Sequence, residues 1–93
     1  MAARLTNRTL GQLLLDLGFQ QGDVTETNHR VWRHPESGCT LFLPANKARE
    51  APRPADVVGI KGQLALHGHL DEGAFDFFAA EGTLPARSSV RPT

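Results

Sequence analysis

The first hydrophobic pattern along the chain is a leucine stripe with the period of an α-helix. Apolar side chains recur at helical spacing at Leu10, Leu13, Leu14 and Leu17. Thr6 can cap the first turn, and Leu5 before it can pack on Leu10. Gly18 can end the helix because glycine adopts the left-handed conformation without a side-chain clash. The pattern predicts a helix over residues 7–17.

Shorter segments with β-strand character follow the helix. Residues 20–28 are polar and threonine-rich, with Val24 as the one aliphatic residue, and predict a weak edge strand. Residues 29–34 and 39–43 predict two stronger strands. The segment Pro35-Glu36-Ser37-Gly38 between them predicts a turn, because proline presets φ and glycine tolerates a positive φ. The middle of the chain therefore predicts three antiparallel strands.

A four-residue turn would set the register of this hairpin. His34 would then pair with Cys39, and Trp32 would face Leu41. One face of the sheet would carry the apolar set Trp32, Cys39, Leu41 and Leu43 and pack on helices. The other face would carry the mixed set His29, Val31, Arg33, Thr40 and Phe42 and face solvent. A slip of one residue would exchange the two faces.

Two helices are predicted in the C-terminal half. After a loop over residues 45–54, Pro54 suits the first position of a helix that runs to about residue 66. Its inward side is predicted to carry Val57, Ile60 and Leu64. Asp71 can cap a last helix that ends at Gly82. The fold class is thus α+β with the order α-βββ-αα, in one domain over residues 5–82 and with a disordered tail over 83–93.

Composition narrows the class of protein. The chain has 93 residues, of which 40% are hydrophobic, and no apolar run approaches the roughly 20 residues of a membrane helix. Its N-terminus lacks the apolar block of a signal peptide, and its lone cysteine, Cys39, has no internal disulfide partner. We expect a cytoplasmic protein with no membrane association.

Charge gives a mixed indication about nucleic-acid binding. The formal net charge is zero, which counts against a dedicated binder of phosphates. Basic residues nevertheless prevail between residues 29 and 53, and acidic residues prevail between residues 54 and 82. This asymmetry either provides a local basic patch or belongs to solvated surfaces with no partner.

The hairpin and its surroundings resemble the HicA family of RNA-cleaving toxins. The matching residues, in order, are Gly18-Phe19, His29, Val31-Trp32, His34-Pro35-Glu36-Ser37-Gly38 and Leu41-Phe42-Leu43-Pro44. The resemblance covers about residues 7–66, and its order and spacing are more specific than any single element. Where the family has Gly-Ser before the histidine, this chain has Thr27-Asn28. The resemblance implies a fold like that of double-stranded RNA-binding domains.

The resemblance also implies an activity and a partner. His29 stands at the position of the family's catalytic histidine, so the implied function is metal-independent RNA cleavage in a toxin–antitoxin pair. The implied partners are RNA and a HicB-like antitoxin, and no cofactor or metal is expected. The residues expected to contact RNA are Asn28, Arg30, Arg33, Phe42, Lys47 and Arg49. Histidine suits this chemistry because it exchanges protons near neutral pH.

Alternatives remain open beside this hypothesis. A histidine at the start of a strand is commonly structural, and the same fold can serve as a non-catalytic module that binds RNA or a protein. His67 and His69 are interpreted as a helix end rather than a metal site, and Cys39 as a small buried hydrophobic residue. The Gly59-Ile60-Lys61-Gly62 sequence has the form of an RNA-gripping Gly-x-x-Gly loop, but its flanking segments do not match.

Overall fold

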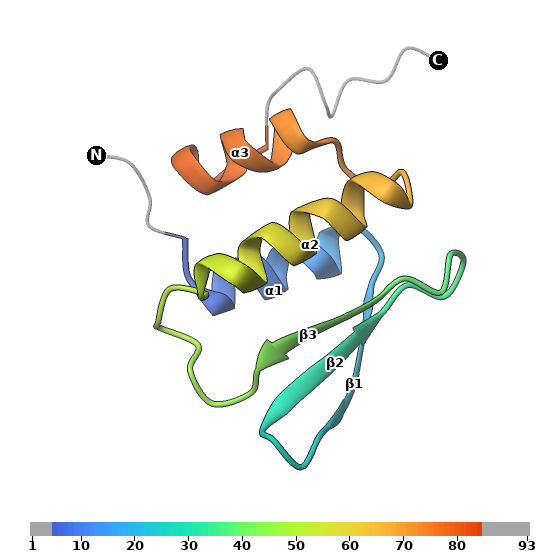
Figure 1. Ribbon diagram of the computed structural model, residues 1–93, viewed down its shortest axis with the longest axis vertical. Helices are drawn as coiled ribbons and strands as arrows, with labels where there is room; N and C mark the ends of the chain where they lie inside the picture. The colour runs from blue at the N-terminus through green and yellow to red at the C-terminus, as the bar shows by residue number, and fades with distance from the viewer. Residues whose placement is uncertain (1–4, 85–93) are drawn as a thin grey trace.

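The computed structural model describes residues 5–84 (Figure 1). Its first element is helix α1, Asn7–Asp16. Thr6 caps it as predicted: its hydroxyl accepts from the Thr9 amide, and the Thr9 hydroxyl accepts from the Thr6 amide. Gly18 follows the helix with φ +100°, a conformation that favours glycine. The predicted helix is confirmed to within one residue at its C-terminal end.

The three strands are β1, Gln20–Val24, β2, His29–Arg33, and β3, Thr40–Pro44. They form one antiparallel sheet in the order β1-β2-β3, so β1 is an edge strand as predicted. β1 is shorter than its predicted range, because a turn occupies the segment after Val24. An irregularity in the pairing lies between Gln21 and Val24.

The register of the β2–β3 hairpin is the predicted one. Trp32 pairs with Leu41, and Val31 pairs with Phe42. The His34 amide donates to the Cys39 carbonyl at 2.9 Å, which closes the four-residue turn. The core face is confirmed, since Trp32, Cys39, Leu41 and Leu43 are buried, whereas Phe42 on the other face is 49% exposed.

Two helices complete the domain, α2 over Pro54–Leu66 and α3 over Glu72–Glu81. Pro54 opens α2, and the Asp71 side chain caps α3 by accepting from the Ala74 amide at 2.7 Å. Gly82 ends α3 in the left-handed conformation. These bounds confirm the predicted helices.

The helices lie on one side of the sheet, with α2 beside α1 and α3 beyond α2 (Figure 1). One hydrophobic core joins all three helices and the inner face of the sheet. Gly11 on α1 allows close packing, because a Cβ atom there would lie 3.1 Å from Cζ2 of Trp32. The protein is therefore a small α+β domain with a three-stranded sheet covered by helices.

A disordered C-terminal tail and the absence of a membrane helix were also predicted from the sequence. Leu84, the last described residue, packs against the core, and residues 85–93 of the predicted disordered tail lie outside the described residues. Within residues 5–84, no helix has the length and apolar character needed to cross a membrane.

Candidate functional site

The connection between β1 and β2 positions His29. The Asn28 amide donates to the Thr25 carbonyl at 3.0 Å, and the Thr25 amide donates to the His29 carbonyl at 2.7 Å. Asn28 has φ +64°, in the left-handed region that asparagine tolerates better than most residues. The His29 amide donates to the Thr25 hydroxyl at 3.2 Å. This tight turn fixes the backbone from which the imidazole projects.

Two threonine hydroxyls orient the imidazole of His29. Nδ1 lies 3.0 Å from Oγ1 of Thr27, which in turn lies 3.0 Å from Oγ1 of Thr25. Nε2 has no hydrogen-bond partner among residues 5–84. The ring is thus held at one nitrogen, while the other nitrogen can exchange a proton with a bound molecule.

His29 borders a pocket of about 330 Å³. Asn28 and Lys47 also line it, as does Arg53 at the end of the loop that precedes α2. A more open depression joins His29 to Phe42 of β3, Thr27 and Arg53 and reaches the first turn of α2 at Asp56. His29 and Arg53 therefore belong to both hollows.

The loop between β3 and α2 is held in place by the start of α1. The Asn7 and Arg8 amides donate to the Glu50 and Ala48 carbonyls, both at 2.9 Å. The side-chain amide of Asn7 donates to the Lys47 carbonyl at 3.0 Å. These bonds use helix N-terminal amides that have no partner within the helix, and they keep Lys47 beside His29.

The charges around the pocket are mixed. Arg53 and Lys47 are positive, and Glu50 and Asp56 are negative. Nε of Arg53 lies 3.1 Å from Oδ2 of Asp56, and this hydrogen-bonded carboxylate raises the pKa of Arg53. The Arg53 side chain is 73% exposed, so the ion pair is weak and an incoming phosphate can compete for the guanidinium.

The structure brings together some of the predicted site residues and separates others. His29, Asn28 and Lys47 line one pocket, and Phe42 borders the adjoining depression. Arg30 lies on the opposite face of the sheet, where its Nη1 donates to the Gly22 carbonyl at 2.9 Å. Arg33 pairs with Thr40 at the far end of the hairpin, and Arg49 is exposed in the loop. Neither Arg33 nor Arg49 lines the His29 pocket.

Three site residues were missing from the predictions made on sequence. Thr25 and Thr27 form the hydroxyl chain behind His29, and Arg53 adds a cation to both hollows. The threonines had a usable signal, because they precede the histidine by four and two residues in a turn segment rich in polar side chains. Arg53 had no such signal, since only the loop path brings it to His29.

The remaining histidines form a separate cluster. The rings of His34 and His69 stack with centroids 4.0 Å apart, and Phe19 packs edge-on against both. Nε2 of His69 lies 2.7 Å from Oγ of Ser37 in the hairpin turn. Within the part of the chain that the structure describes, no group of three or more potential metal ligands comes together. The cluster ties the end of α2 to the hairpin.

The structure also places the two other candidate sites of the sequence, Cys39 and the Gly59–Gly62 segment. Cys39 is 1% exposed, and burial raises the pKa of its thiol, which makes it a core residue rather than a nucleophile. The Gly59–Gly62 segment lies inside α2 and forms no loop. Both observations agree with the interpretations made on sequence.

Comparison of the chain with models of protein families, with curated proteins and with solved structures finds no match. The likeness to HicA toxins therefore stays a prediction drawn from the residues themselves.

Proposed function

We propose that this protein is a HicA-like RNA-cleaving protein of a toxin–antitoxin pair, with His29 as the acid–base residue. The observation that carries the proposal is the geometry of His29. Its Nδ1 is hydrogen-bonded to Thr27, and its Nε2, which has no hydrogen-bond partner among residues 5–84, can accept a proton from a bound molecule. Lys47 and Arg53 line the pocket that the ring borders. We also propose that its fold is of the type found in double-stranded RNA-binding domains.

The chemistry is transfer of the phosphoryl group to the neighbouring 2′-hydroxyl of the RNA. Nε2 of His29 takes the proton of the 2′-hydroxyl while its oxygen forms a bond to phosphorus. The bond from phosphorus to the 5′-oxygen breaks, and that oxygen takes a proton from water or from the imidazolium. The products are a 2′,3′-cyclic phosphate and a 5′-hydroxyl, and no metal takes part.

Lys47 and Arg53 support this role through charge. Both line the pocket that His29 borders, and cations there favour the phosphate and the charge that develops on it during transfer. Phe42, half exposed beside His29, offers a base a surface for stacking. One positioned acid–base group contributes about 10²- to 10⁴-fold to a rate, which suits a slow enzyme.

A non-catalytic module that binds a protein is the second candidate. Val58 and Leu66 on α2 and Phe77 on α3 are large hydrophobic residues that are 66%, 74% and 43% exposed. A partner protein, such as a HicB-like antitoxin, would cover such residues whether or not His29 is catalytic.

The two candidates are separated by incubating the purified protein with RNA in the presence of EDTA. RNA cleavage with cyclic-phosphate ends supports the first candidate. Intact RNA, together with no RNA retention on a filter at low salt, leaves only the protein-binding module.

A further inference from the structure

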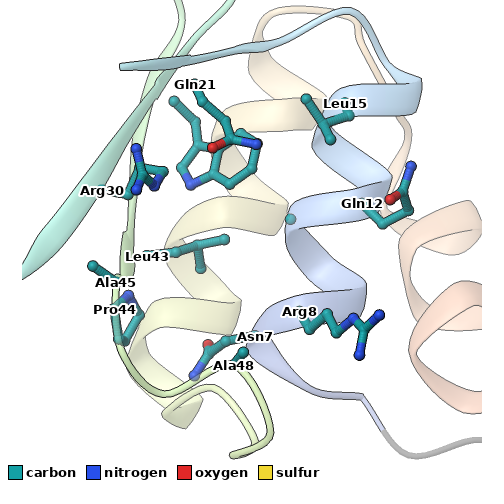
Figure 2. Close-up of a pocket in the computed structure, with 12 residues that line it drawn as sticks. Asn7, Arg8, Gln12, Leu15, Gln21, Arg30, Leu43, Pro44, Ala45 and Ala48 are labelled. Carbon is teal, nitrogen blue, oxygen red and sulfur yellow. The ribbon is translucent and has the colours of Figure 1, made fainter. Parts of the chain in front are cut away.

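A second pocket, of about 240 Å³, lies between α1 and the sheet and takes no part in the chemistry proposed for His29. Figure 2 shows Arg8, Gln12 and Leu15 of α1 along one wall and Arg30 and Leu43 on the opposite side. The pocket adjoins the His29 pocket, because Asn7 and Pro44 line both.

Two buried polar atoms of this pocket's lining residues have no partner in the described chain. They are Oδ1 of Asn7 and Nε1 of Trp32, in residues that are only 5% and 6% exposed. Nδ2 of Asn7 donates to the Lys47 carbonyl at 3.0 Å, so the oxygen is the unpartnered atom of that amide. Buried polar groups normally have partners, so Oδ1 of Asn7 calls for a hydrogen-bond donor and Nε1 of Trp32 calls for an acceptor.

The size and charge of the pocket indicate what that molecule is. Pockets for drug-sized ligands measure about 300–1,000 Å³, so this smaller pocket suits a single ring-sized group. Trp32 and Leu43 supply apolar walls, and Arg8 of α1 and Arg30 of β2 lie on opposite sides, with the Arg8 side chain extending away from the sheet (Figure 2). A polar planar ring with anionic groups attached fits these features.

We propose that this pocket receives one unstacked nucleobase of single-stranded RNA. Polar atoms of the base donate to Oδ1 of Asn7 and accept from the indole N–H of Trp32, while Arg8 and Arg30 favour the flanking phosphates. Both atoms are covered in the unbound protein, so binding requires side chains of the pocket to move, among them the exposed Gln21, which pairs with Trp32 in the sheet. The inference deepens the function proposed for His29 and rests on it, because the base site adjoins the phosphate site.

Trp32 provides the assay, because it is the one tryptophan of the chain. Its fluorescence is measured while the His29→Ala protein is titrated with each of the four nucleoside 5′-monophosphates, then with ribose 5-phosphate and with inorganic phosphate. The pocket predicts a saturable change with at least one nucleotide and none with the two compounds that lack a base. An equal change with ribose 5-phosphate would mean an anion site and would overturn the proposal.

A variant that fills the pocket locates the binding. Ala48 is exposed and lines this pocket but not the His29 pocket, so Ala48→Phe should raise the nucleotide Kd at least about tenfold, or about 1.4 kcal/mol. Ala80→Phe on the exposed side of α3 is the matched control and should leave the Kd unchanged. Equal nucleotide affinities in the two variants would contradict the proposal. So would the absence of a saturable fluorescence change up to about 10 mM nucleotide, which is ten times a weak Kd of about 1 mM.

The outcomes separate this proposal from the one for His29. If nucleotides bind but the wild-type protein leaves RNA intact, the base pocket stands and the cleavage proposal fails. If RNA is cleaved in a His29-dependent way but no nucleotide binds, cleavage stands and the base pocket fails.

Discussion

Nδ1 of His29 lies 3.0 Å from Oγ1 of Thr27, and this hydrogen bond ties the candidate catalytic ring to the turn that precedes it. In the HicA pattern the residues before the histidine are Gly-Ser, and here they are Thr27-Asn28. The Thr27 hydroxyl, at a position where the resemblance to that pattern would place glycine, thus supplies the contact that orients His29.

Removal of the Thr27 hydroxyl should lower activity without unfolding the protein. Thr27→Val keeps the shape of the exposed side chain but leaves Nδ1 of His29 without a partner, so we expect RNA cleavage to slow by about tenfold, less than the 10²- to 10⁴-fold of a complete acid–base group. Thr27→Ser keeps the hydroxyl and should restore the rate. The rate measured across pH is the decisive readout, because a merely structural role would leave its pH dependence unchanged.

Stability should fall in mild acid because of His69. Burial, the largest cause, and then the nearby His34 and His67 lower the pKa of His69, with a smaller opposing effect from Glu36. The unfolded chain therefore binds a proton more readily than the folded one as the pH falls through about 6.5, the ordinary value for histidine. The stability contributed by neutral His69 is present above that pH and is lost as the pH falls through the lowered folded pKa.

The measurement is urea unfolding at pH 7.5 and pH 5. His69→Gln should reduce the difference in unfolding free energy between the two pH values. His29→Gln, which removes a histidine outside the cluster, should leave most of it. An unchanged pH dependence in His69→Gln would show that the stacked rings do not set acid stability.

Glycine-to-alanine substitutions should have opposite effects at two open positions. A Cβ at Gly62, inside α2, would meet nothing within 4 Å, so Gly62→Ala should raise the free energy of unfolding by about 1 kcal/mol through helix propensity. Gly38 is equally open but has φ +77°, so Gly38→Ala should lower it by about 1–2 kcal/mol. Chemical denaturation of the two variants tests both signs, and a loss of stability in Gly62→Ala would contradict this account of α2.

Local signals in the chain were enough to predict most of the fold. The cap at Thr6, the turn before Cys39 and the cap at Asp71 each depend on contacts within a few residues, and all three were predicted. The register followed from the turn length, which then assigned Trp32 to the core face.

The site was less predictable because its contacts depend on the path of the chain. Asn7 holds Lys47 across 40 positions of sequence, and that contact brings the loop to His29. His69 meets Ser37 across 32 positions. The position of Arg30, in contrast, was predictable from the sequence, because side chains alternate along β2 and Arg30 therefore lies on the face opposite His29. Hydrophobic periodicity carries no information about such pairs of distant polar residues.

The central claim is that His29 moves the proton in RNA cleavage, and the most direct test is the cleavage rate with and without its imidazole. In EDTA, wild-type protein should cleave single-stranded RNA, and His29→Ala should be slower by about 10²- to 10⁴-fold. His67→Ala, which removes an exposed histidine distant from the pocket, should retain the wild-type rate. Intact RNA with the wild-type protein, or equal rates for wild type and His29→Ala, would contradict the account.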